Sequence, residues 1–319
     1  MKIFNNIPVV WQISALHLTA KRTLFSGVLL SNSPFTYDTK IGVLSNLIKV
    51  IKSYFIRAYA NKEISITSNG STINTNTDKH GGFQLIVGFQ HNGEIKINIA
   101  GLDKPLRILQ TYPISFHNTN SPFDVISDID DTIIVSYTAH FFKRVGALVF
   151  TPPKKRKVIG FSKKIFAEFR KQDARIFYIS KSESNLFGVL TSFITHNNLP
   201  KGKLFLTPFS NFYQLLFEKK DKDFKIESIR FLIGNSENKK YVLFGDDSQQ
   251  DIDIYSKIAG EYPRQILKIY IRQTKNKIFP YQKRMLEKLK SSNLLVEYFK
   301  ADTKIDTEKE ISQLKNYYQ

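Results

Sequence analysis

Apolar and polar residues follow one another in different ways along the chain. Between residues 41 and 59 the apolar residues recur at intervals of three and four, as in a helix with one buried side, but the N-terminal segment 1–59 as a whole has no single period and is predicted to be of mixed structure. From residue 60 to 118 apolar and polar residues alternate in short runs, which turn signals such as Asn69-Gly70 separate. This alternation predicts a small antiparallel β domain, of the sandwich type, over residues 60–118.

Beyond the polar linker 118–122 the pattern changes to short apolar strands separated by helical stretches. The predicted strands are Phe123–Asp128, Arg175–Ser180, Lys203–Leu206, Tyr241–Gly245 and Ile266–Arg272, and the predicted helices lie near 161–171, 185–196, 225–233 and 251–260. This alternation predicts a doubly wound α/β domain, an open parallel sheet with helices on both faces, over residues 122–275. Residues 276–319 are predicted to form a basic C-terminal extension, helical with one short strand.

An acidic run follows the first predicted strand of the α/β domain. Asp128 and Asp130 come where the apolar strand ends, and their side chains start on the same side because Cβ directions alternate in an extended chain. Two like charges at the edge of a core are unfavourable unless a metal ion or a proton relieves the repulsion. The pair therefore indicates a site for a cation or a phosphoryl group, and a simple polar turn stays open as the alternative.

Further polar groups stand at later strand and helix ends. Ser180 ends the second predicted strand, Asp246 follows the fourth with Asp251 soon after it, and Lys225 begins a helix. Because the carboxyl ends of parallel strands share one edge of a sheet, we expect these groups to meet Asp128 there. The hydroxyl suits a phosphate oxygen, the ammonium offsets phosphoryl charge and the carboxylates suit a hard cation.

Composition narrows the classes of function. The chain has 319 residues, enough for a sizeable core, and its lack of cysteine excludes disulfides, thiolate zinc sites and a cysteine nucleophile. The net charge of +19 indicates an anionic partner: nucleic acid, an anionic lipid surface or a polyphosphorylated substrate. No apolar run approaches the ~20 residues of a membrane-spanning helix. We therefore expect a cytoplasmic protein, either soluble or peripheral at the inner membrane surface.

Basic segments and histidines have less specific interpretations. The basic loop 152–158 is interpreted as a solvated loop beside an anionic-substrate site, able to attract an anionic membrane surface, with a nuclear import signal or a nucleic-acid contact as alternatives. The mixed aromatic and basic run 141–144 suits either a membrane interface or the core, and the basic helix 283–290 is expected to pack on the sheet. His80 and His91 are interpreted as turn and surface histidines rather than metal ligands.

Taken together, the motifs resemble a known family. Ser127–Thr132, Tyr178–Ser180, Lys225 and Gly245-Asp246 with Asp251 resemble the four-motif pattern of haloacid dehalogenase-like phosphatases. More closely, residues 122–275 resemble the phosphatidate phosphatase catalytic domain family that is associated with fungal actin-patch proteins and is widespread in bacteria. Further segments that carry the likeness are Leu199–Gly202, Asp251–Tyr255, Tyr262–Arg264 and Ile269–Arg272, with a weaker likeness of 77–83 to the β domain of bacterial members.

The resemblance implies a role for each motif residue. Asp128 is the implied nucleophile, which forms an aspartyl-phosphate, and Asp130 the implied acid and base. Mg²⁺ is the implied cofactor, held by Asp128, the backbone carbonyl of Asp130, and Asp246, with Asp251 as an outer or additional ligand. The implied phosphate-binding residues are Ser180, Lys225 and Thr132, the last of which would also orient the first loop.

The chain departs from the family pattern at several positions. The second motif reads Ser180–Ser184 (SKSES) without the usual Pro and Trp, which puts lipid-specific contacts in doubt, and Phe224 replaces the His that usually precedes the motif lysine. Asp247 replaces a Ser and is expected to face solvent, with stronger metal binding as the alternative. The expected reaction is dephosphorylation of phosphatidate or a related phospholipid. Alternatives are a phosphatase of soluble or nucleic-acid phosphomonoesters, and a non-catalytic protein that binds an anionic surface or nucleic acid.

Overall fold

A computed structural model describes residues 7–34, 43–130, 132–133, 159–217, 223–247, 250–274, 278–291 and 294–316 of the chain. The chain forms two compact units. The first unit comprises Met1–Asn118 with Ser182–Ser192 and Leu206–Lys220, and the second comprises Thr119–Lys181, Phe193–Phe205 and Asp221–Gln319.

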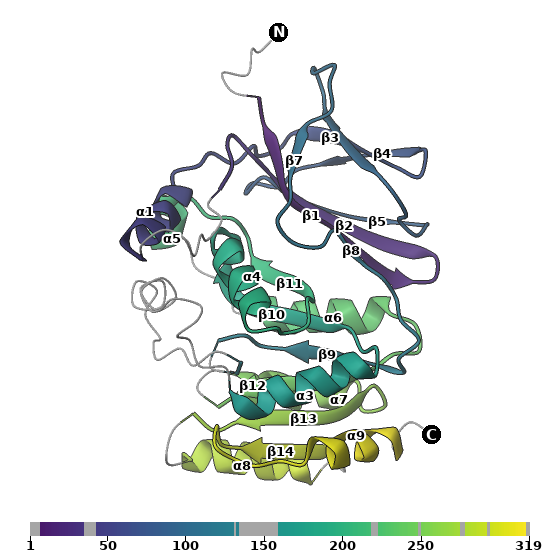
Figure 1. Cartoon of the computed structure of the whole chain (residues 1–319), viewed down its shortest axis with the longest axis vertical. Helices are drawn as coiled ribbons and strands as arrows, with labels where there is room; N and C mark the ends of the chain where they lie inside the picture. The colour runs from purple at the N-terminus through teal and green to yellow at the C-terminus, as the bar shows by residue number, and fades with distance from the viewer. Residues whose placement is uncertain are drawn as a thin grey trace. The chain divides into compact units, whose positions relative to one another are not determined.

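The first unit is built from two β-sheets (Figure 1). One sheet has the order β5-β2-β1-β7, with β8 also paired to β1, and the other has the order β4-β3-β6. Their bounds are β1 Val9–Thr19, β2 Arg22–Leu30, β3 Glu63–Ser68, β4 Ser71–Asn76, β5 Gly82–Val87, β6 Ile95–Ile99, β7 Arg107–Leu109 and β8 Ser115–Phe116. Apolar residues of both sheets form one buried cluster, and most strand pairs are antiparallel, so the predicted antiparallel β fold is confirmed. The strands β1 and β2 lie outside the range 60–118 that the sequence predicts for it.

The strands β1 and β2 come from a segment whose sequence shows no strand period. All residues of β1 are buried, and its polar residues change from even positions (Gln12, Ser14) to odd positions (His17, Thr19), so the alternation breaks midway along the strand. Gln12 has φ 52°, and the register with β2 shifts between Trp11 and Ser14. A bulged strand that is buried on both faces hides the pattern on which strand prediction depends.

The histidine interpretation is wrong with respect to exposure, because both His80 and His91 are buried. The ring of His91 shares a hydrogen bond of 2.7 Å with the Ser68 hydroxyl, and its pKa is lowered by burial first and by His117 second. A hydrogen-bonding role inside the β domain therefore accounts for His91.

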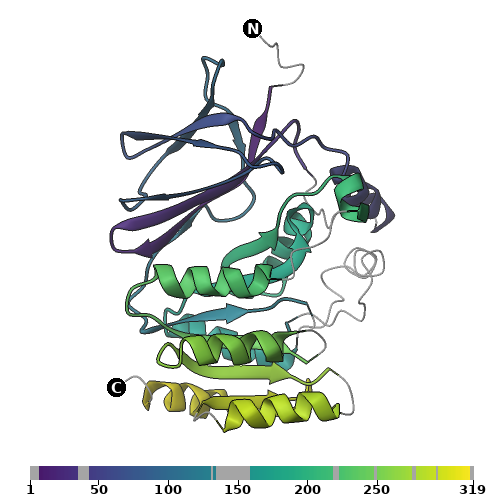
Figure 2. The ribbon, with the colours of Figure 1, turned by 180° about the vertical axis from the view of Figure 1, so that it is seen from behind.

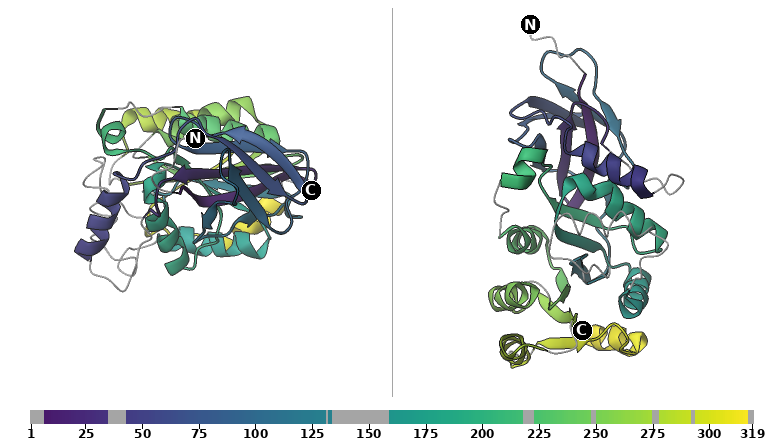
Figure 3. Two further views of the ribbon diagram at one scale, coloured as in Figure 1. Left: turned by 90° about the horizontal axis from the view of Figure 1, so that it is seen from above. Right: turned by 90° about the vertical axis from the view of Figure 1, so that its left-hand side faces the viewer.

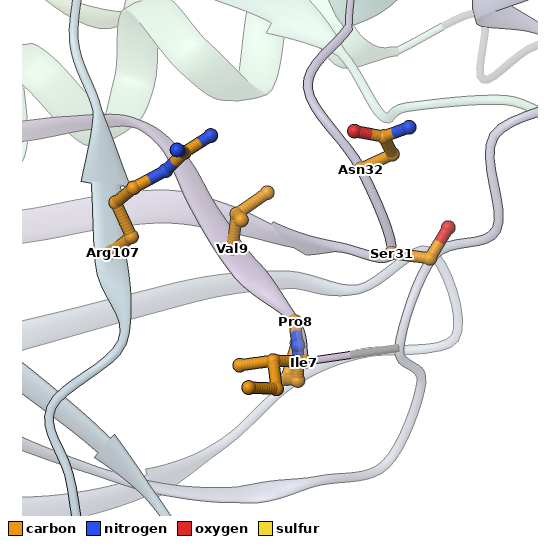
Figure 4. A pocket seen from close by; sticks show the side chains of 6 residues that line it. All are labelled: Ile7, Pro8, Val9, Ser31, Asn32 and Arg107. Atoms are coloured by element: carbon orange, nitrogen blue, oxygen red, sulfur yellow. The ribbon is translucent and has the colours of Figure 1, made fainter. Parts of the chain in front are cut away.

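Short helices complete the first unit. They are α1 Val43–Ser53, the 3₁₀ turn η2 Ser184–Leu186, the beginning of α4 Phe187–His196, and α5 Phe212–Phe217. Trp11 packs edge-on against Phe187 and Phe209, at ring-centroid distances of 5.6 and 6.1 Å, which fixes these later segments to β1. A pocket in the same unit is lined by Ile7, Pro8, Val9, Ser31, Asn32 and Arg107, and contains none of the predicted site residues (Figure 4).

The second unit contains a six-stranded sheet of order β11-β10-β9-β12-β13-β14. Its strands are β9 Phe123–Ser127, β10 Ile176–Glu183, β11 Lys203–Thr207, β12 Lys240–Asp246, β13 Ile266–Arg272 and β14 Leu295–Phe299. The pairs β10–β9, β9–β12, β12–β13 and β13–β14 are parallel. All five predicted strands are present, and the short strand of the C-terminal extension adds the sixth.

Helices cover both faces of this sheet, as a doubly wound fold requires. Figures 2 and 3 show α6 Phe224–Asn235, α7 Asp251–Glu261 and α8 Pro280–Lys290 on one face, with α3 Gly160–Lys171 and α9 Thr307–Asn316 on the other. Aromatic rings fill the core, where Phe244 stacks on Tyr270 with ring centroids 4.2 Å apart. The predicted α/β fold class is confirmed.

Two close contacts explain why Gly202 and Tyr178 stand where the segment 199–202 meets β10. A Cβ on Gly202 would lie 2.0 Å from the carbonyl oxygen of Ile176, so only glycine fits there. The Tyr178 hydroxyl donates to the carbonyl oxygen of Pro200 at 2.9 Å. The segment 199–202 therefore packs directly on β10, which contains Ser180 and continues three residues past the predicted strand end to Glu183.

A buried ion pair joins Arg175, directly before β10, to Asp124 in β9. The Arg175 guanidinium donates to the Asp124 carboxylate, with its shortest contact at 2.6 Å, and both side chains are under a tenth exposed. Removal of one partner leaves an uncompensated buried charge, so we expect Arg175→Leu to lower the free energy of unfolding by about 3–5 kcal/mol.

Urea unfolding measures this effect, and Arg170→Leu, on the exposed side of α3, is the matched control. The double variant Arg175→Leu/Asp124→Leu should recover a large part of the loss, because it buries no unpaired charge. A loss of under about 1 kcal/mol in the single variant would show that the pair is dispensable.

Candidate functional site

The carboxyl ends of β9 and β12 bring two aspartates together. These strands are parallel neighbours with Phe244 opposite Ser127, so the residues that follow them leave the sheet at the same edge. The Asp128 backbone N–H donates to the carbonyl oxygen of Phe244 at 2.9 Å, and the Tyr255 hydroxyl donates to the same oxygen at 2.7 Å. Asp128 and Asp246 are thus held by the sheet itself.

A cluster of three carboxylates forms at this edge. Asp128, Asp246 and Asp251 each offer an oxygen, these oxygens lie within 4.8 Å of one another, and all three residues are buried. The Thr132 hydroxyl lies 3.4 Å from Asp128 Oδ2 and 3.5 Å from Asp246 Oδ2. The sequence prediction that these distant acids converge agrees with this geometry.

Asp251, the first residue of α7, has both carboxylate oxygens engaged. Its Oδ1 accepts from Lys225 Nζ at 2.5 Å, and its Oδ2 accepts from the Asp246 backbone N–H at 3.2 Å. Gly245 makes this possible, because a Cβ there would lie 2.6 Å from Asp251 Oδ2 and 2.6 Å from Tyr255 Cε2. The glycine thus lets α7 approach the end of β12.

We therefore expect Gly245→Ala to displace Asp251 and Tyr255 and to lower the free energy of unfolding by about 1–3 kcal/mol. The phosphate release that the sequence motifs lead us to expect should fall at least tenfold. The control is Gly260→Ala in α7, where a Cβ meets nothing within 4 Å. Ala is the better helix former, so the control should gain about 0.5–1 kcal/mol. Equal stability and activity in the two variants would contradict the close approach.

Lys225, near the start of α6, supplies the positive charge of the site. Its side chain is 1% exposed, and Nζ lies 3.0 Å from Asp128 Oδ1 as well as 2.5 Å from Asp251 Oδ1. Burial lowers the pKa of Lys225, but attraction and hydrogen bonds from Asp128 and Asp251 outweigh burial and raise it above its usual value. The side chain is a permanent ammonium that orients both carboxylates.

Negative charge is nonetheless in excess. The pKa of Asp128 is raised well above its usual value, first by burial and then, against the lowering effect of Lys225, by Asp251, Asp246 and Asp130. Hard oxygen donors with uncompensated negative charge are what a divalent cation binds. The cluster of Asp128, Asp246 and Asp251 can therefore hold a metal ion.

Asp130 and Ser180 form a second pair beside this cluster. The Ser180 hydroxyl donates to Asp130 Oδ2 at 3.2 Å, and both residues are buried. The Asp130 carboxylate is not part of the cluster of Asp128, Asp246 and Asp251, and it pairs with Ser180 instead. The intervening Asp131 lies outside the described residues.

The expectation that Asp247 faces solvent is wrong. Asp247 is 3% exposed, and its carboxylate accepts from the Thr274 backbone N–H at 2.8 Å, from the Thr274 hydroxyl at 2.5 Å and from the Tyr298 hydroxyl at 2.6 Å. Its own N–H donates to the carbonyl oxygen of Arg272. Asp247 thus fastens the loop after β12 to β13 and β14.

Lys181 is a residue near the site that the sequence prediction missed. Its ammonium donates to Gln250 Oε1 at 3.1 Å. The pKa of Lys181 is lowered by burial first and by Lys225 second, while Asp251 and Asp128 act in the opposite direction. Its place directly after Ser180, at the edge where the strands end, is the signal that could have identified it.

Several predicted segments lie outside the described residues, namely the basic loop 152–158 and the run 141–144. Among the helices that the structure describes, none has the length and apolar character to cross a bilayer.

Comparison with solved structures gives low similarity. A chain of a Pnkp1/Rnl/Hen1 complex is 20% identical, covers 48% of this chain and 50% of its own, and has a TM-score of 0.32. Cytosolic 5'-nucleotidase IIIB bound to cytidine is 10% identical, covers 62% of this chain and 86% of its own, and has a TM-score of 0.33. At these scores the likeness supports no argument about function.

Comparison with known sequences gives matches of higher identity than comparison with solved structures does. Phosphatidate phosphatase APP1 of Saccharomyces cerevisiae is 32% identical over 190 residues, which are 57% of this chain and 31% of the relative. An uncharacterized protein of Schizosaccharomyces pombe is 30% identical over 149 residues, 46% of this chain and 24% of the relative. The chain thus matches under a third of the length of each relative. Residues 123–273 match the family model described as "Phosphatidate phosphatase APP1, catalytic domain", so this part of the chain is similar to the catalytic domain of that family.

Proposed function

We propose that the protein is a Mg²⁺-dependent phosphomonoesterase that works through an aspartyl-phosphate on Asp128 and dephosphorylates phosphatidate or a related phospholipid. One observation carries the proposal: the buried carboxylates of Asp128, Asp246 and Asp251 cluster at one edge of the sheet, where Lys225 pairs with Asp128 and Asp251, within the segment that matches the APP1 catalytic domain. Clustered carboxylates beside a buried ammonium suit the binding of a cation and a phosphoryl group.

In the proposed first step an Asp128 oxygen attacks phosphorus in line, and the bond from phosphorus to the lipid oxygen breaks. Asp130, on the same loop, gives a proton to the departing oxygen. In the second step Asp130 takes a proton from water, whose oxygen attacks the same phosphorus and releases phosphate, so that Asp128 is regenerated. The hydroxyl of Ser180, 3.2 Å from Asp130 Oδ2, orients that carboxyl group.

The remaining residues position charge. Asp128, Asp246 and Asp251, with the backbone carbonyl of Asp130, would hold Mg²⁺, which keeps the nucleophile and the phosphate from repelling each other. Lys225 has three N–H donors, and hydrogen bonds to Asp128 and Asp251 leave one for a phosphoryl oxygen. Ser180 and Thr132 bind further phosphoryl oxygens in this proposal.

The choice of a phospholipid as substrate rests on the family similarity and on the net charge of +19, which favours anionic surfaces. A peripheral position on a cytoplasmic membrane surface follows from the same proposal. The substitution of SKSES in the second motif affects the residues around Ser180, so Lys181 would contact the head group where the family has another side chain.

The deciding experiment compares phosphate release from phosphatidate in vesicles with release from soluble sugar phosphates, nucleotides and nucleic-acid ends. We expect release from phosphatidate that requires Mg²⁺ and disappears in EDTA, with Ca²⁺ as the control for a wrong cation. Release from soluble esters alone would remove the lipid assignment and keep the reaction class. Absence of release from every ester, together with Mg²⁺-independent binding to vesicles or nucleic acid, would indicate a binding protein.

A further inference from the structure

An exposed apolar patch lies on the first unit, where the end of α1 meets the beginning of α5 (Figure 1). The Phe212 backbone N–H donates to the carbonyl oxygen of Tyr54 at 2.9 Å, and the rings of Phe55 and Phe212 stack with centroids 5.3 Å apart. We call the exposed apolar residues at this junction the α1–α5 patch; they are Ile48, Ile51, Phe55, Phe212 and Tyr213, and their exposed fractions run from 38% to 70%.

The patch is continuous, and it is not the side of α1 that faces the core. Ile48 and Ile51 are one helical turn apart, and Ile51 is followed four residues later by Phe55, which stacks on Phe212. The buried side of the same segment carries other residues, among them Val50 and Tyr54. A short helix with two apolar sides needs only one of them for the core, so the other side is available for an interaction outside the core.

The charged residues of the two segments that carry the patch are basic. Lys49, Lys52 and Arg57 are exposed within and directly after α1. Neither residues 43–62 nor residues 207–217 contain an aspartate or a glutamate. Exposed aliphatic and aromatic side chains beside exposed basic residues match the interface of an anionic bilayer, where rings and aliphatic chains enter the acyl boundary and ammonium groups reach lipid phosphates.

We propose that the α1–α5 patch docks the protein on an anionic lipid bilayer. A second copy of the chain would place the basic residues of two α1 helices against each other. A nucleic acid would leave Ile48 and Ile51 without an apolar partner. The proposal rests on the proposed function only for its purpose, since docking would bring the enzyme to a membrane-bound phospholipid. The physical argument for docking uses the patch alone.

Flotation with vesicles of phosphatidylcholine, with and without about 30 mol% phosphatidylglycerol, tests the proposal. We expect wild-type protein to float with the anionic vesicles only, and salt to weaken the binding. Ile51→Ser/Phe55→Ser should reduce vesicle affinity at least about tenfold. Lys49→Glu/Lys52→Glu should reduce it at least about 25-fold, since each lysine contributes about fivefold near such a surface.

The matched control is Lys96→Glu/Lys104→Glu, two exposed lysines of the same unit outside α1 and α5, which should change vesicle affinity less than threefold. All variants should have wild-type melting temperatures and unchanged phosphate release from a soluble phosphomonoester. Equal loss in patch and control variants would overturn the proposal, as would a dimer in solution that Ile51→Ser/Phe55→Ser dissociates. Asp128→Asn separates the two proposals: if it floats like wild type, docking stands whether or not wild-type protein releases phosphate.

Discussion

Asp128→Asn is expected to abolish phosphate release and, in metal-free buffer, to make the protein more stable. Loss of the nucleophile should cost at least about 10⁴-fold in kcat, because an amide cannot form the acyl phosphate. The gain in stability, about 1–3 kcal/mol, is expected because burial and the neighbouring Asp246, Asp251 and Asp130 disfavour the charged form of Asp128, while Lys225 keeps Asp251 as its partner. Most active-site substitutions lower activity, but few raise stability at the same time, so the combination is diagnostic.

The pH dependence has a defined sign. Burial and neighbouring acids raise the pKa of Asp128 in the folded protein, so its charged form is disfavoured there. The stability of metal-free wild-type protein should therefore fall as pH rises above about 4, the pKa in the unfolded chain, toward the higher pKa of the folded state. Asn lacks this titration, and the difference in stability between the two proteins should grow over that range.

Thermal unfolding in EDTA from pH 4 to 8, with phosphate release at saturating Mg²⁺, provides both measurements. Asp302→Asn, an exposed carboxylate of the second unit, is the control and should change neither quantity appreciably. Mg²⁺ should stabilise wild-type protein more than Asp128→Asn, which has lost a ligand. Retained activity in the variant would place the nucleophile elsewhere, and lower stability in EDTA would contradict the excess of negative charge.

Lys225→Met should have the opposite effect on stability. Methionine fills a similar volume but leaves Asp128 and Asp251 without their ammonium partner, which lies 3.0 and 2.5 Å from them. Loss of one partner from a buried ionic group costs about 3–5 kcal/mol, and loss of a positive group at a phosphoryl site costs about 10²–10³-fold in kcat. Mg²⁺ should restore part of the stability but not the activity, because it replaces the charge and not the position of the ammonium.

Urea unfolding and phosphate release test this expectation, and Lys164→Met on the exposed side of α3 is the control. The double variant Asp128→Asn/Lys225→Met gives a sharper result. Because it lacks both members of one ion pair, it should be more stable than Lys225→Met alone, with a coupling of at least about 1 kcal/mol. Additive effects would mean that Lys225 and Asp128 do not interact.

The sequence predicted those parts of the fold and site that depend on local patterns. Strands of the second unit are short apolar runs, and Asp128 and Asp246 fall at the ends of β9 and β12. These residues could therefore be assigned to one edge together with Ser180, although β10 continues past Ser180 to Glu183. Similarly, the Asn69-Gly70 turn joins β3 and β4 with positive φ at both residues, as its sequence predicts. Such features need only a few neighbouring residues.

Other parts depend on contacts between distant residues. The strand β1 is buried on both faces, so nothing in its own sequence marks which residues oppose β2, β7 and β8. Asp247 is buried because Tyr298, 51 residues later, donates to it. Likewise, His91 is buried by partners that include Ser68 and Thr23. The exposure of a polar side chain cannot be predicted from its neighbours in the sequence when its hydrogen-bond partner lies on another strand.

The strand β14 has a consequence for where the catalytic part of the chain can be cut. A fragment that stops at residue 273, where the family match stops, would leave β13 as an open sheet edge, although all of its residues are buried in the full chain. Such a fragment would also lack the Glu310 carboxylate that pairs with Lys268 and the Tyr298 hydroxyl that donates to Asp247. Unpaired edges invite association with other chains. We therefore expect the smallest stable fragment that contains the six-stranded sheet to extend to the last helix, well past the recognisable motifs.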